Sequence, residues 1–162
     1  SLEVDVRLTD GAAGLLTTPS AGKIYRGNNT LASQRQQVAV KVAGNSVVEW
    51  LPLETIVFDG ARGELSLRVD LDDSSQCALW DIVCLGRRAS GETFTNGYLN
   101  QRVEVWRDGV PLYVEMNRFQ GGGDMLSGRW GMAGRSSSSS FSRATGRWSS
   151  ATSRWASVWL RN

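Results

Sequence analysis

The sequence contains no histidine, and its 162 residues include only two cysteines and three prolines. The absence of histidine excludes His-based catalytic triads and every zinc site with an imidazole ligand. No apolar run reaches the about 18 residues that a membrane-spanning helix needs, so none is expected. Cys77 and Cys84 are expected to be small core residues with free thiols, because their spacing alone does not indicate a disulfide.

The N-terminal stretch Ser-Leu-Glu-Val-Asp-Val-Arg lacks the basic and apolar regions of a secretory signal peptide. Cytoplasmic localisation is therefore expected. The stretch also lacks an initiator methionine, so the chain is expected to be a fragment or a processed product.

The formal net charge of +2 hides an uneven distribution of charge along the chain. Residues 1–128 carry twelve Lys and Arg against sixteen Asp and Glu, whereas residues 129–162 carry six Arg and no acidic residue. The basic isoelectric point is thus a property of the C-terminal segment. It does not indicate a nucleic-acid-binding body.

Short segments with alternating apolar and polar residues recur between turns that contain glycine, as in Leu2–Leu8 and in residues 98–107. About ten such segments at intervals of 8–12 residues, with little helical periodicity, predict an all-β fold. Stacked antiparallel or mixed sheets, of an irregular solenoid-like or sandwich type, fit this pattern, and so does a closed barrel. The apolar run from Cys77 to Leu85, interrupted only by Asp81, fits either a buried strand or one short helix.

Residues 49–62 are apolar enough to run through the middle of the fold, yet they include Glu49, Glu54, Asp59 and Arg62. Two interpretations of these charges stay open. One is ionic pairing of the acids with nearby Lys and Arg residues, and the other is an acid-lined interior path for a cation. Asp81 is the most suggestive acid, because a lone buried carboxylate is costly unless it is paired or bound to metal.

The C-terminal segment has a different composition from the rest. After Gly121-Gly122-Gly123, residues 135–162 are rich in Ser, Arg and Trp and show no sustained periodicity. We predict two regions: a β domain over 1–134 and a poorly ordered tail over 135–162 that is foreign to it. An alternative function of the tail is RNA binding, with Trp148, Trp155 and Trp159 stacking on bases.

Four blocks of sequence carry a resemblance to a known family: LLTTPSAGKIYR (15–26), EWLPLETIVFDGAR (49–62), CLGRRASGE (84–92) and QRVEVWRDG (101–109). In order and spacing they resemble the urease accessory proteins of the UreD (UreH) family, over residues 1 to about 134. Family members carry a further N-terminal segment, which predicts that this chain is truncated. They also continue with an apolar strand where this chain has its Ser/Arg tail, so we hypothesise a frameshift after about residue 134.

The resemblance implies a non-enzymatic β-sheet scaffold that binds the urease apoprotein and the UreF-type and UreG-type accessory proteins. It also implies that nickel passes through to the urease active site as a transient cargo. On physical grounds we assign Glu54, Asp59 and Asp81 to the candidate nickel path. The family blocks supply the partner-binding or structural candidates, which are Lys23, Tyr25, Arg26, Glu49, Trp50, Pro52, Arg62, Gly86, Arg87, Gly91 and Glu92.

Two rival functions follow from the residues alone. One is a β-solenoid carbohydrate-active enzyme, which needs two carboxylates facing each other across a cleft. The other is RNA binding through the basic tail, which would be lost on deletion of residues 135–162.

Overall fold

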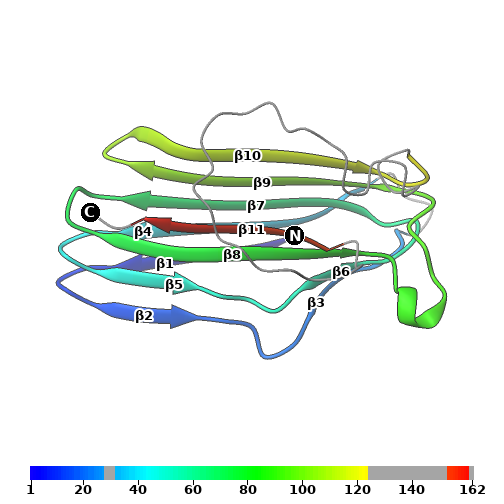
Figure 1. The fold of residues 1–162 in the computed structure, drawn as a ribbon, viewed down its shortest axis with the longest axis horizontal. Helices are drawn as coiled ribbons and strands as arrows, with labels where there is room; N and C mark the ends of the chain where they lie inside the picture. The colour runs from blue at the N-terminus through cyan, green and yellow to red at the C-terminus, as the bar shows by residue number, and fades with distance from the viewer. Residues whose placement is uncertain (28–31, 124–152, 161–162) are drawn as a thin grey trace, which may run out of the picture.

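The structure is a computed structural model that describes residues 1–27 and 32–123, and the backbone of residues 153–160. This part of the chain forms two stacked β-sheets and one short 3-10 helix, η1 (Arg88–Ser90) (Figure 1). The first sheet has the strand order β1 (Leu2–Leu8), β4 (Gln34–Val42), β7 (Arg62–Leu71), β9 (Tyr98–Arg107) and β10 (Val110–Gln120). The second sheet has the order β2 (Ala13–Leu16), β5 (Val47–Trp50), β8 (Gln76–Leu85), β6 (Thr55–Val57) and β3 (Gly22–Ile24), with β11 (Ser153–Leu160) paired to β8. The predicted all-β class is confirmed.

The chain winds between the two sheets as an irregular coil. After each of β1, β4 and β7 in the first sheet the chain passes through the second sheet and returns, so β1, β4, β7 and β9 become parallel neighbours. The same winding makes β2, β5 and β8 parallel, and likewise β3, β6 and β8. Two antiparallel strands complete the described arrangement, because β10 pairs with β9 and β11 pairs with β8.

Turns stack on one another at one end of the sandwich, where the chain crosses from the first sheet to the second. The Gly11 N–H donates to the Gly44 carbonyl at 2.7 Å, and the Gly44 N–H donates to the Asp72 carboxylate at 2.7 Å. The Ser75 hydroxyl and the Gly44 N–H, with Ser74, lower the pKa of Asp72 to about 2. Each turn thus binds the next, which sets the register of the coil.

The interior contains two separate hydrophobic clusters. The larger one fills the half of the sandwich next to the stacked turns, and its residues include Val40, Val48, Val69, Leu79 and Val105. The smaller one lies toward the other end; it consists of Ile24, Val57, Ala61, Leu65, Val83, Phe94, Leu99 and Phe119. Side chains from both sheets contribute to each cluster, so burial of apolar surface joins the two layers.

Several details differ from the sequence-based expectation. The undecided run 77–85 is strand β8, which pairs with β5 through its first half and with β6 through its second. Residues 49–62 do not run through the fold as one segment: β5 ends at Trp50 and β6 begins only at Thr55. Pro52 lies in the gap and has no N–H to donate to a sheet.

Most of the predicted tail lies outside the described residues. Within it, Ser153–Leu160 forms β11, paired antiparallel with β8 from Ser153↔Cys84 to Leu160↔Cys77. The division of the chain at residue 134 stays a prediction. In the described part of the chain, no helix has the length and apolar character needed to cross a membrane.

Candidate functional site

A layer of polar side chains separates the two hydrophobic clusters. Inward positions are mostly apolar along β4 and β9, but Gln34 and Gln36 on β4 and Gln101 on β9 occupy this phase as well. From the second sheet, β6 contributes Thr55 and β8 contributes Asp81. A cavity of about 160 Å³ lies here, with Gln36, Thr55 and Asp81 in its lining beside Trp50 and Pro52. This volume leaves room for several water molecules.

Asp81 is the one carboxylate among the residues that line this cavity. Its Oδ2 accepts a hydrogen bond from Gln101 Nε2 at 2.8 Å. Burial raises the pKa of Asp81, the Gln101 amide works against that rise, and the nearby Glu115 carboxylate adds to it. The Asp81 carboxyl group has more lone pairs than the Gln101 amide occupies, so it can still offer an oxygen ligand.

The hydrogen bonds continue from Asp81 across the first sheet to β10. Asn117 Nδ2 donates to Gln101 Oε1 at 3.2 Å and to Glu115 Oε1 at 3.0 Å. Glu115 Oε2 in turn accepts a 2.5 Å hydrogen bond from the Tyr113 hydroxyl. Burial, together with Glu115, raises the pKa of Tyr113, so this phenol stays a donor at neutral pH. We call Gln36, Thr55, Asp81, Gln101, Tyr113, Glu115 and Asn117 the polar layer.

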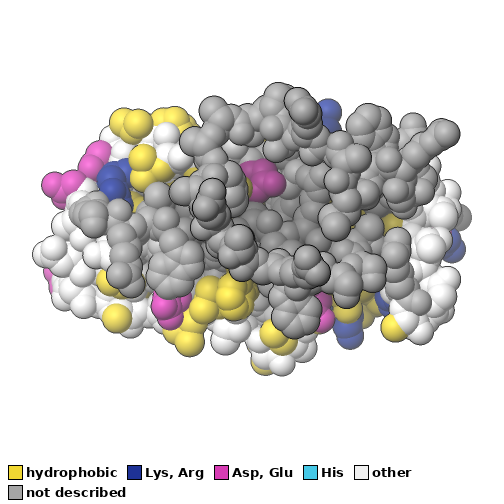
Figure 2. Space-filling model, in the orientation of Figure 1, with side chains coloured by type: hydrophobic (Ala, Val, Ile, Leu, Met, Phe, Trp, Pro, Cys, Tyr) yellow, Lys and Arg dark blue, Asp and Glu magenta, His cyan; other side chains and the backbone are white. Residues whose placement is uncertain are grey.

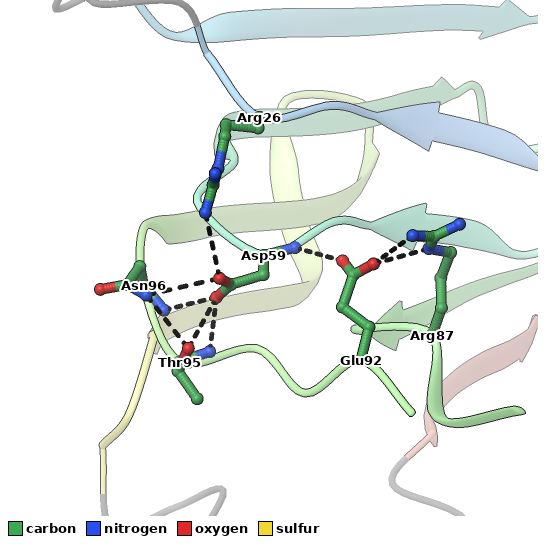
Figure 3. Close-up of polar contacts among 6 residues, drawn as sticks. All are labelled: Arg26, Asp59, Arg87, Glu92, Thr95 and Asn96. Atoms are coloured by element: carbon green, nitrogen blue, oxygen red, sulfur yellow. Dashed lines mark hydrogen bonds and ion pairs between the residues drawn. The ribbon is translucent and has the colours of Figure 1, made fainter. Parts of the chain in front are cut away.

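A second cluster of polar side chains lies at the end of the sandwich opposite the stacked turns (Figure 3). We call it the corner, and its residues are Arg26, Asp59, Arg87, Glu92, Thr95 and Asn96. Asp59, in the turn between β6 and β7, accepts hydrogen bonds from the backbone N–H groups of Thr95 and Asn96, both at 2.7 Å. The Thr95 hydroxyl adds a third at 3.0 Å, and Arg26 approaches at 3.5 Å. Partial burial acts to raise the pKa of Asp59, but the donors of Asn96 and Thr95 outweigh it and lower this pKa to about 2.

Glu92 holds the other side of the corner. Its Oε1 accepts the Asp59 backbone N–H at 2.7 Å, while Arg87 Nε donates to its Oε2 at 2.7 Å. The Asp59 N–H and Arg87 together lower the pKa of Glu92. The Arg87 guanidinium also lies 4.5 Å from the centre of the Phe58 ring, which in turn lies 4.8 Å from that of Tyr25. The corner thus joins three of the sequence blocks, 15–26, 49–62 and 84–92.

The comparisons with known proteins agree with the blocks. A family model described as UreD urease accessory protein matches residues 1–157. The chain belongs to the UreD family. Its relatives named urease accessory protein UreD include those of Saccharophagus degradans, 46% identical over 132 residues, and Dechloromonas aromatica, 44% identical over 133 residues. Each alignment covers 82% of this chain but only 45% and 46% of the relative, so the chain spans a little under half of their length.

The three acids assigned to the nickel path have different surroundings in this UreD-family chain. Asp59 belongs to the corner, where backbone N–H groups bind its carboxylate. Its carboxylate also lies 3.5 Å from the Arg26 guanidinium, a contact of the kind that the ionic-pairing interpretation describes. Asp81 belongs to the polar layer. Glu54 lies between β5 and β6, and its charge adds to the effect of burial, which raises the pKa of Cys84. Among the described residues, no three Cys, Asp or Glu side chains gather as a metal-binding group. The path assignment stays a prediction.

Some of the remaining family-block residues lie at the two sites, and others lie elsewhere along the strands and loops. Trp50 and Pro52 line the cavity, and the Pro52 carbonyl accepts the Trp80 indole N–H at 2.8 Å. At the corner, Gly86 has a φ of 75°, and a Cβ there would lie 2.7 Å from the Glu92 carbonyl oxygen. The others lie along the strands or the β8–β9 loop: Lys23 in β3, Glu49 in β5, Arg62 at the start of β7 and Gly91 after η1.

Sequence reasoning missed most of the polar layer of this UreD-family chain. The alternation of residues 98–107 includes Gln101 without singling it out, and no pattern in the sequence marks Glu115 or Asn117. A signal was present, because Gln36 and Gln101 each occupy the apolar phase of an otherwise Val-rich or Leu-rich strand. A polar residue in the buried phase must find a partner inside the fold.

Proposed function

We propose that this chain acts in urease maturation as a non-enzymatic, cytoplasmic scaffold. It binds the urease apoprotein with UreF-type and UreG-type accessory proteins, so that nickel reaches the urease active site. Its membership of the UreD family is the observation that carries this proposal, because the relatives bear the name urease accessory protein. The two-sheet coil supports a scaffold role, since its stacked sheets present extended surfaces to partners.

We further propose that the polar layer is where nickel crosses the sandwich as cargo. Asp81 offers the carboxylate oxygen, and Gln101, Asn117 and Glu115 extend the line of oxygen ligands toward β10. Carboxylate, amide and water oxygens suit a divalent cation, and single, weak contacts let it move on. Glu54 stands as a second candidate on this route. Asp59 stands as the third, although its four closest donors already hold it in the corner.

Urease activation in cells tests this route. A host that carries the urease operon without its own UreD-type gene receives this chain, and the nickel content per urease subunit is measured. The unmodified chain is expected to raise nickel content, and Asp81→Asn and Glu54→Gln to lower it. Glu3→Gln, at an exposed acid on β1, is the matched control and should have no effect. Full nickel loading by Asp81→Asn, with the complex intact, would remove Asp81 from the path.

No observation favours the rival functions. The cavity lining contains one carboxylate, whereas glycoside hydrolysis needs two that face each other across the substrate. Residues 135–152 of the tail lie outside the described residues, so RNA binding gains no support from the fold.

A further inference from the structure

The outer surface of the corner combines cations with aromatic rings. Lys23 and Tyr25 flank the buried Ile24, so both side chains point away from the interior, and Tyr25 is 52% exposed. Tyr25, Phe58 and Arg87 form a continuous row of contacting groups across the ends of β3, β6 and β8. Figure 2 shows dark-blue Lys and Arg side chains at this right-hand end of the molecule.

The two acids of the corner do not neutralise this surface fully. Asp59 directs its carboxylate to the backbone of Thr95 and Asn96, and Glu92 is bound by the Asp59 N–H as well as by Arg87. Arg26 has a 70% exposed side chain and reaches Asp59 through one nitrogen at 3.5 Å. A guanidinium has five N–H donors, so Arg26 keeps most of its donors for a ligand.

We propose that Lys23, Tyr25, Arg26, Phe58 and Arg87 form a docking site for an acidic, extended segment of a protein partner. Carboxylates of the segment pair with Arg26 and Lys23, and its apolar side chains pack on the aromatic row. The site follows from the corner alone; that its partner belongs to the urease assembly rests on the proposed function.

A peptide ligand fits this surface better than a nucleic acid does. A nucleic-acid duplex carries one charge per about 1.7 Å along its whole length, whereas the cations of this surface are confined to one end of the sandwich. Arg26 and Arg87 in the corner and Lys23 on the adjoining strand β3, beside rings of limited extent, match a short segment with a few carboxylates.

Fluorescence anisotropy with the full chain tests the site. The probe is a labelled ten-residue peptide of alternating Glu and Val, compared with its Gln-for-Glu analogue and with a labelled oligonucleotide. We expect the Glu peptide to bind at least about tenfold more tightly than either, with an affinity that falls as salt rises. Equal binding of the Glu and Gln peptides would refute the proposal. Tighter oligonucleotide binding that Lys23→Glu/Arg26→Glu abolishes would assign the surface to nucleic acid instead.

Variants locate the binding. The double variant Lys23→Glu/Arg26→Glu removes cations that the fold barely uses, so it should weaken the Glu peptide at least about tenfold. Tyr25→Ala should weaken both peptides by about threefold, because it removes ring area and no charge. The matched control is Arg7→Glu/Lys41→Glu, an exposed cross-strand pair of one Arg and one Lys on the first sheet. An equal loss in this control would refute the site, and because no urease component is present, that result leaves the proposed function unaffected.

Discussion

Removal of the Asp59 carboxylate should destabilise the fold by opening the corner. Asp59→Ala leaves the N–H groups of Thr95 and Asn96 without their 2.7 Å acceptor and the Thr95 hydroxyl without its 3.0 Å acceptor. A hydrogen bond to a charged group contributes about 1.5–3 kcal/mol, and water replaces part of that at this partly exposed position. We expect Asp59→Ala to lower the free energy of unfolding by about 2–3 kcal/mol.

Asp59→Asn separates the acceptor from its charge. The amide oxygen can still accept the two backbone N–H groups, so the loss should be about 1 kcal/mol, smaller than that of Asp59→Ala. The exposed Asp5, which pairs with Arg7 at 3.3 Å on β1, provides the matched control: Asp5→Asn should change stability by less than about 0.5 kcal/mol.

The pH dependence gives a second, independent readout. The pKa of Asp59 is lowered from 3.8 to about 2 in the folded chain, so its charge stabilises the fold above about pH 4. That stabilisation is lost as the pH falls toward 2. Urea unfolding followed by tryptophan fluorescence at pH 7, 4 and 2 should show the gap between unmodified chain and Asp59→Asn closing at the acid end. If Asp59→Ala unfolds at the unmodified midpoint, or the gap persists at pH 2, Asp59 does not hold the corner.

Three further outcomes are expected in the same urea assay. Burial disfavours the charged form of Asp81, so Asp81→Asn should leave the free energy of unfolding unchanged or raise it at pH 7. The difference in stability between this variant and the unmodified chain should shrink near pH 4. A marked loss of stability at pH 7 would contradict this. Gly97 has a φ of 93°, and a Cβ there would lie 2.0 Å from the Ala61 carbonyl oxygen, so Gly97→Ala should lower the free energy of unfolding by more than about 3 kcal/mol. A Cβ at Gly109 meets open space, so Gly109→Ala should lower it by only about 1 kcal/mol. Similar losses for the two variants would be inconsistent with the backbone clash. Leu79→Ala should cost about 2–5 kcal/mol as a fully buried side chain, and a cost below 1 kcal/mol would indicate a looser core.

Local sequence patterns predicted the strands well, because alternation and glycine turns are properties of neighbouring residues. Leu2–Leu8 alternates without a break, and it is strand β1. The order of the strands could not be predicted in the same way. A turn such as Asp10-Gly11 serves a hairpin or a crossing between sheets equally well, and here it leads from β1 in one sheet to β2 in the other.

The two sites differ in how far the sequence could have revealed them. Charges in residues 49–62 indicated a special role, but only the fold shows Asp59 bound to the backbone of residues 95 and 96, far along the chain. Asp81 was identified from its isolation in an apolar run. Its partners could not be, since Gln101 and Glu115 reach it through the stacking of β8 against the first sheet.

Co-purification tests the urease-maturation scaffold most directly. The tagged full chain is expressed with the urease apoprotein and the UreF-type and UreG-type proteins in nickel-free medium, then isolated and analysed by native mass spectrometry. We expect one complex that contains the chain and the urease apoprotein in a fixed ratio. Recovery of the folded chain without urease or either accessory protein would contradict the account.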